Sequence, residues 1–232
     1  MEGPDVSNIT IKDTPNGLFY NGKWDVLMPY FRNITINPGL WDLNSLFYEN
    51  HNYTDLSYIT FKMNCNMYYF GGLESVFCNC SRLTAIPNFD WSSTSIGAPS
   101  SGFKVDSIFA GCNNLRTISD TFFSDIPLSD SYSQNIRGTS MFYNCYSLRK
   151  LPDLSWFDGR NTFISSSNNI YQWIFYDCQS LDEIVDLPIL KPANTPTYSG
   201  FEDGFYACSR IKEMTFKTGT GSAPRTDSGW TS

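Results

Sequence analysis

A short skeleton of apolar residues recurs along this chain and limits how the chain can fold. The skeleton is an aromatic residue followed, at steps of three, by Cys and then by two aliphatic positions, for example Phe142, Cys145, Leu148 and Leu151. Copies begin at Phe77, Phe109, Phe142, Phe175 and Phe205. Successive copies are therefore 32, 33, 33 and 30 residues apart, and a period of this length is typical of stacked repeat proteins. The sequence predicts a solenoid in which each repeat packs against the next.

The residues before each Phe indicate a short helix. In the first copy, apolar residues stand at positions i, i+3, i+4 and i+7, namely Leu73, Val76, Phe77 and Cys80. This spacing is the apolar stripe of a helix of about two turns. We therefore expect one such helix in each repeat, at residues 73–80, 105–112, 138–145, 171–178 and 201–208.

Segments that favour β-structure follow each Cys. They begin at residues 83, 115, 148, 181 and 211, with sequences such as LTAIPNF and LDEIVDL, and each is about as long as one strand. The related sequences VSNITI, FRNITI and LSYITF begin upstream at residues 6, 31 and 56. Together these segments predict about eight strand rungs.

The chain is predicted to be one solenoid domain with three parts. These are divergent N-terminal repeats at 1–72, five regular Phe-x-x-Cys repeats at 73–218 and a C-terminal tail at 219–232. In the divergent part, Asn50 stands where Cys stands later. Loops rich in Ser, Asn, Gly and Pro occupy residues 91–102, 124–138, 158–169 and 191–200, and loops on a rigid frame often carry recognition.

Composition bears on partners and location. The net charge is -7 and no run of Lys or Arg occurs, which argues against nucleic acid as a partner. Charged residues make up 17% and aromatic residues 16%, a balance that favours a binding scaffold or adhesin. No segment resembles a secretion signal or approaches the ~18 apolar residues of a membrane span. We expect an extracellular, cell-surface or virion location, with the chain being a fragment or a virion component.

The repeat copies resemble a known family. MFYNCYSLRKLPDL, VFCNCSRLTAIPNF and IFYDCQSLDEIVDL resemble the BspA-like class of bacterial leucine-rich repeats, which occurs in surface proteins and phage structural proteins. The resemblance covers residues 73–216 well and 6–61 in part. It implies a leucine-rich-repeat solenoid (α/β) with one parallel strand per repeat, short helices on the opposite side, and a role in adhesion and protein recognition. It transfers no catalytic residue.

Five cysteines hold the same place in consecutive repeats: Cys80, Cys112, Cys145, Cys178 and Cys208. We interpret them as a buried packing column, because free Cys is among the most buried residue types. A disulfide or metal role is the alternative. The odd count of 7 cysteines argues against full pairing. Cys78 and Cys80 form the only close pair, and Cys65 has no assignable partner.

No motif predicts catalysis. The single histidine, His51, lies in a polar insertion without a hydrolase motif. Adjacent carboxylates such as Asp182 and Glu183 are common on solvated surfaces, whereas a glycosidase needs them opposed at roughly 5 to 9 Å. We predict no enzyme, no cofactor and no metal, and a glycan-active enzyme is the most distant alternative.

The strand face is the candidate binding surface. Side chains alternate along a strand, so residues beside each buried aliphatic should point outward. One predicted outward column changes from neutral to charged, and a second contains Pro87 and Pro152. From the first column we select Tyr58, Thr117, Lys150, Glu183 and Glu213 as candidate ligand-binding residues; a merely solvated sheet is the alternative.

These observations predict a non-enzymatic binding or adhesion scaffold. We expect it on a bacterial surface protein or a phage particle, where it recognises a protein or glycan on a host or cell surface. The alternative is a purely architectural virion or surface-assembly component that packs against neighbouring copies.

Overall fold

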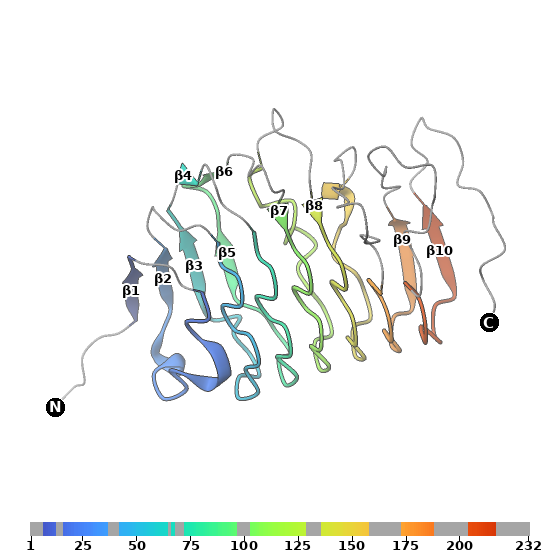
Figure 1. The fold of residues 1–232 in the computed structure, drawn as a ribbon, viewed down its shortest axis with the longest axis horizontal. Coiled ribbons are helices and arrows are strands. Elements are labelled where there is room, and N and C mark those ends of the chain that lie inside the picture. Colours follow the sequence, from blue (N-terminus) through green and yellow to red (C-terminus); the bar gives the residue numbers. More distant parts are fainter. Residues whose placement is uncertain are drawn as a thin grey trace.

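The strands of this protein are parallel and follow one another along the long axis of the molecule (Figure 1). The computed structural model describes residues 7–12, 16–36, 42–64, 66–67, 72–96, 103–128, 136–157, 173–187 and 204–216. A parallel sheet at one end contains β1 (Asn8–Ile11), β2 (Asn33–Ile36), β3 (Thr60–Met63) and β5 (Asn88–Asp90). At the other end, β9 (Glu183–Leu187) pairs in parallel with β10 (Glu213–Phe216). The predicted parallel-strand solenoid is confirmed.

Between these two sheets the chain repeats its path without an assigned strand at the predicted rungs. The segments that follow Leu115 and Leu148 contain no strand, yet backbone bonds join them. The Arg149 N–H donates to the Arg116 carbonyl at 3.1 Å, and the Asp182 N–H donates to the Arg149 carbonyl at 3.4 Å.

Shorter elements complete the described part of the chain. Two parallel pairs lie along the edge beyond the ends of the main strands (Figure 1). They are β4 (Asn66–Met67) with β6 (Ser95–Ile96), and β7 (Phe103–Lys104) with β8 (Ile136–Arg137). The 3₁₀ helices are η1 (Tyr20–Gly22), η2 (Met28–Tyr30) and η4 (Ser155–Phe157). Cys65, the tail at 219–232 and the predicted loops at 158–169 and 191–200 lie outside the described residues, as do parts of the other two loops.

The segments predicted as two-turn helices are instead series of tight turns, so the helix prediction is wrong in the described repeats. Two residues adopt a left-handed backbone in each of these segments except the last, where Ala207 is the one among the described residues. In the first copy these are Ser75 and Asn79, with φ of 58° and 60°. We call the surface made by these segments the turn face; it comprises residues 44–49, 74–79, 106–111, 139–144, 173–177 and 204–207.

Backbone hydrogen bonding explains the turns. The N–H groups of Val76 and Cys78 donate three residues back, whereas those of Ser75 and Phe77 donate to the Asp106 and Ile108 carbonyls of the next repeat, both at 2.9 Å. An α-helix would commit every interior N–H to its own chain four residues back. The turns therefore leave alternate N–H groups free to join neighbouring repeats.

A column of stacked phenylalanine rings fills the core behind the turn face. Ring centroids of consecutive members lie 5.0 to 5.8 Å apart, with interplanar angles of 2° to 28°. The strand side joins this column where Phe61 of β3 meets Phe47 edge-on at 5.8 Å. The phenylalanine column consists of Phe19, Phe47, Phe77, Phe109, Phe142, Phe175 and Phe205.

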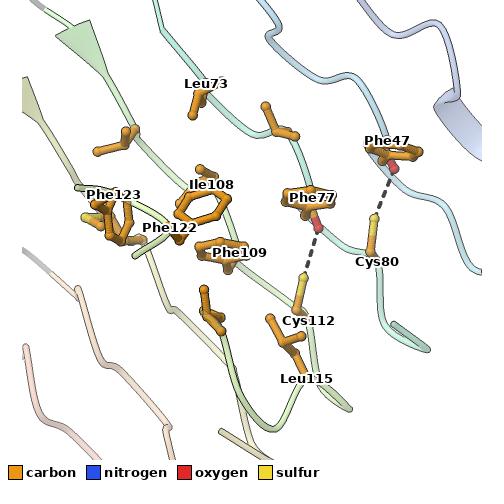
Figure 2. Packing of buried hydrophobic residues seen from close by; sticks show 14 of the residues in the cluster. Phe47, Leu73, Phe77, Cys80, Ile108, Phe109, Cys112, Leu115, Phe122 and Phe123 are labelled. Carbon is orange, nitrogen blue, oxygen red and sulfur yellow. Dashed lines mark hydrogen bonds between the residues drawn. The ribbon is translucent and has the colours of Figure 1, made fainter. Parts of the chain in front are cut away.

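The five repeated cysteines line the phenylalanine column. Each Sγ–H donates to the carbonyl of the column Phe in the preceding repeat, at 3.0 or 3.1 Å. Figure 2 shows two of these bonds, from Cys80 to Phe47 and from Cys112 to Phe77. Asn50, at the equivalent position upstream, donates from Nδ2 to the Phe19 carbonyl at 3.0 Å. The cysteines in this column are free thiols, and all but the half-buried Cys208 are fully buried, which confirms the predicted packing column.

Replacing an interior ring of the phenylalanine column should destabilise the whole solenoid. Phe142 stacks on a ring in each direction, so Phe142→Ala should lower the free energy of unfolding by about 3 to 5 kcal/mol in urea titrations. Phe205 is only partly buried, and Phe205→Ala should cost clearly less. Equal losses at the two positions would contradict the account of the column.

Candidate functional site

The strand register places Tyr58 outside the predicted outward column. Asn33 pairs with Thr60, so Thr60 holds the place that the sequence had given to Tyr58. Tyr58 instead lies in the turn before β3, where its ring stands 5.2 Å from the Arg32 guanidinium and its hydroxyl donates to the Met28 carbonyl at 3.4 Å. Its side chain is 40% exposed, but it does not continue the column.

The other four candidates are exposed and occupy equivalent places in consecutive repeats. Glu183 and Glu213 are paired in the β9–β10 register. Lys150 forms an ion pair with Asp120, whose Oδ2 lies 2.8 Å from its Nζ. The carboxylate nearest to Lys150 therefore comes from Asp120, and Glu183 stands beside another carboxylate. Thr117 completes this row on the N-terminal side.

The second predicted outward column is wrong at its prolines. Pro87 and Pro152 are both buried. Side-chain alternation applies only along a strand, and β5 begins after Pro87, at Asn88. At Pro152 no strand is present, so alternation does not set the direction of its side chain.

A row of aromatic side chains occupies the turn face and was not predicted. Rings of Tyr143 and Tyr176 stack at 5.0 Å, and those of Tyr176 and Tyr206 stack at 4.8 Å. Each of these tyrosines directly follows a Phe of the phenylalanine column. Reading this position along the sequence gives Tyr20, Tyr48, Cys78, Ala110, Tyr143, Tyr176 and Tyr206, and that recurrence is the signal that could have revealed the row.

Trp173 is an exception within the repeat. The equivalent residues Ser45, Ser75, Ser107 and Ser140 share its left-handed backbone, with φ between 52° and 58°. A bulky residue rarely adopts this conformation, because its Cβ crowds the backbone. Trp173 is nevertheless 40% exposed, and its ring centroid lies 6.5 Å from that of Tyr143.

These side chains surround a surface pocket on the turn face. The pocket has a volume of about 460 Å³ and is open to solvent. It spans three repeats, and none of the lining residues that the structure describes carries a charge. The described residues that line it are Ser107, Ala110, Ser140, Tyr143, Trp173 and Tyr176.

The buried thiols are poor nucleophiles. Burial raises the pKa of Cys80 to about 12 and that of Cys208 to about 11. Burial also raises the pKa of Cys112 well above its usual range. Cys78 is half-buried on the turn face, and burial, with the nearby Glu49 carboxylate, raises its pKa to about 11. Because the thiolate is the reactive form, these groups serve packing.

Within the described ranges, no group of three or more His, Cys, Asp or Glu side chains is placed to hold a metal ion. None of the helices described is long and apolar enough to cross a membrane. No family model, curated protein or solved structure matched this chain in the comparisons.

The five cysteines that line the phenylalanine column should make stability depend on pH in alkaline solution. An unfolded thiol titrates near pH 8.5, whereas the buried thiols keep their protons, so stability is fully present below about pH 8.5 and is lost as pH rises toward the folded pKa values. Each thiol should lower the free energy of unfolding by roughly 1.4 kcal/mol per pH unit in this window. Urea titrations between about pH 8 and 10.5 measure this slope.

Cys112→Ala is the matched variant, because its thiol is fully buried. It should remove one thiol's share of the slope, whatever it does to stability at neutral pH. An unchanged slope in this variant would contradict the assignment.

Proposed function

We propose that this protein is a non-enzymatic binding scaffold, a solenoid that presents recognition residues on a rigid frame. One observation carries the proposal: Trp173 and Tyr206 are 40% and 59% exposed while belonging to an ordered aromatic row. Large aromatic side chains are enriched in binding sites, because they provide wide contact area with little loss of conformational freedom. The backbone bonds between repeats hold their turns in place before a ligand arrives, which reduces the entropic cost of binding.

We also propose that the solenoid is a leucine-rich repeat with about eight rungs. Leu83, Leu115, Leu148 and Leu181 are all buried at the same repeat position, which supports a leucine-rich repeat. Backbone bonds from Arg116 through Arg149 to Asp182 support counting the two segments without assigned strands as rungs. We further propose that these are BspA-like repeats and that the chain belongs to a bacterial surface protein or a phage particle.

The strand face is a second proposed contact surface. Its exposed row of Thr117, Lys150, Glu183 and Glu213 differs in charge from the uncharged pocket of the turn face. The two surfaces therefore suit different ligands, a protein with charged groups on the strand face and an uncharged molecule on the turn face. Tyr58 is not part of this row.

An architectural role is the alternative. Within the described residues, β1 pairs with β2 alone and β10 pairs with β9 alone. Unpaired strand edges can join to another sheet, so end-to-end packing of copies in a virion or surface assembly is physically reasonable. Such a protein should show self-association that depends on concentration in sedimentation experiments.

A binding screen tests the scaffold proposal. The full 232-residue chain, immobilised, should bind at least one member of a panel of host surface proteins and glycans with a saturable response. Either Trp173→Ser on the turn face or the pair Lys150→Glu and Glu183→Lys on the strand face should weaken that response.

Thermal unfolding of each variant is the control. All three residues are exposed, and substitutions at exposed positions usually change stability by less than about 0.5 kcal/mol. No saturable binding in the panel, or binding that none of the folded variants changes, would overturn the scaffold proposal.

A further inference from the structure

We propose that the pocket on the turn face binds a neutral carbohydrate, with the rings of Tyr143 and Trp173 as its platform. The inference rests on the proposed scaffold function and specifies the ligand class of one surface. It is carried by the interrupted aromatic row, by the bulky Trp173 at a left-handed position where the equivalent residues are Ser, and by the chemistry of the pocket lining.

The row of stacked tyrosines stops at the pocket. One face of the Tyr143 ring lies against Tyr176, with their centroids 5.0 Å apart and their planes 19° from parallel. The opposite face is directed toward the preceding repeat, where Ala110 stands in place of a tyrosine. Both residues line the pocket. The pocket therefore lies where the row of rings is interrupted, and it suits a ring-shaped ligand.

Trp173 provides a second wall of the pocket, although a bulky residue is strained in its backbone conformation. The residue adopts a φ of 58° at a position where the earlier repeats have Ser, which tolerates this conformation better than a bulky side chain does. Residues held in such conformations cluster at functional sites. Its ring is inclined by 58° to Tyr143, so the two rings form a corner. A ligand in the pocket can contact both.

The lining matches the two surfaces of a sugar. One face of a pyranose ring presents C–H groups, which pack on the electron-rich face of an aromatic ring. The edge of the sugar carries hydroxyls, and the hydroxyls of Ser107 and Ser140 can both donate to and accept from them. None of the six lining residues within the described part of the chain is charged, so among them a charged ligand would lose its hydration without gaining a partner of opposite charge.

The dimensions favour a sugar over a protein surface. The pocket of about 460 Å³ falls within the roughly 300 to 1,000 Å³ typical of small-ligand sites. A stable protein partner needs about 800 Å² on each side, far more than six residues provide. A short saccharide fills the pocket with one or two of its rings.

Calorimetric titration of the full chain with neutral hexasaccharides tests the inference. The probes are cellohexaose, chitohexaose and mannohexaose, with a heparin-derived hexasaccharide as the charged comparison. We expect saturable binding of at least one neutral probe, and no binding of the charged one. Quenching or a blue shift of tryptophan fluorescence should accompany binding.

Two variants introduce residues that the repeat itself uses at the same positions. Trp173→Ser removes one wall, and Ala110→Tyr adds a ring beside the pocket with the residue found at 20, 48, 143, 176 and 206. Each variant should lower the affinity for the neutral saccharide by about tenfold or more. The thermal unfolding temperature should stay unchanged or rise. Trp24→Ser is the matched control, since Trp24 is 46% exposed with a φ of 84° and does not line the pocket; this variant should bind normally.

The outcomes separate this inference from the scaffold proposal. Saccharide binding that both pocket variants leave unchanged overturns the inference, because the sugar then binds elsewhere. If no neutral probe binds but the screen finds a protein whose capture Trp173→Ser abolishes, the pocket belongs to a protein interface; the scaffold proposal stands and the carbohydrate inference fails. If neither saccharides nor proteins bind, both fail. If Ala110→Tyr fails to fold, Trp173→Ser alone decides.

Discussion

Stacking of phenylalanine rings between repeats is the interaction on which the rest of this structure depends. Each interior ring of the column contacts the ring before and the ring after it at 5.0 to 5.8 Å. The same residues also join the repeats through hydrogen bonds. The Phe109 N–H donates to the Met141 carbonyl of the next repeat, and the Phe109 carbonyl accepts from the Cys145 thiol of that repeat. One position thus fixes both the spacing and the alignment of neighbours. Stability in such stacked repeats comes largely from these neighbour contacts.

The period and the burial of the cysteine column could be predicted, because five in-phase copies of Phe and Cys leave packing as the simplest explanation. The helix could not be excluded from sequence, since the positions of Leu73, Val76 and Phe77 suit both a helix and a turn series that buries the same side chains. The register error at Tyr58 has a similar origin. A slip of two residues keeps every side chain on the same face, so alternation cannot distinguish Tyr58 from Thr60 as the partner of Asn33.

The candidate pocket arises where the repeat departs from its own pattern. The inward positions of the repeat form the frame, so the outward positions can vary at little cost in stability. This variation puts Ala110 one repeat before Tyr143, and Trp173 one repeat after Ser140. Neither change is conspicuous in the sequence, because each concerns a single residue within a long repeat. Their proximity follows only from the stacking of repeats, which brings residues about 33 positions apart into one surface pocket.

Native-state hydrogen exchange at the phenylalanine column tests the central claim most directly. The amide groups of Phe77, Phe109 and Phe142 donate to the next repeat, so their protons should exchange only through opening of the stacked frame. We predict one shared exchange free energy for the three amides, equal to the free energy of global unfolding measured in urea. Exchange of these amides as rapid as that of exposed residues such as Thr117 would show that the column does not hold the repeats together, and would contradict the account.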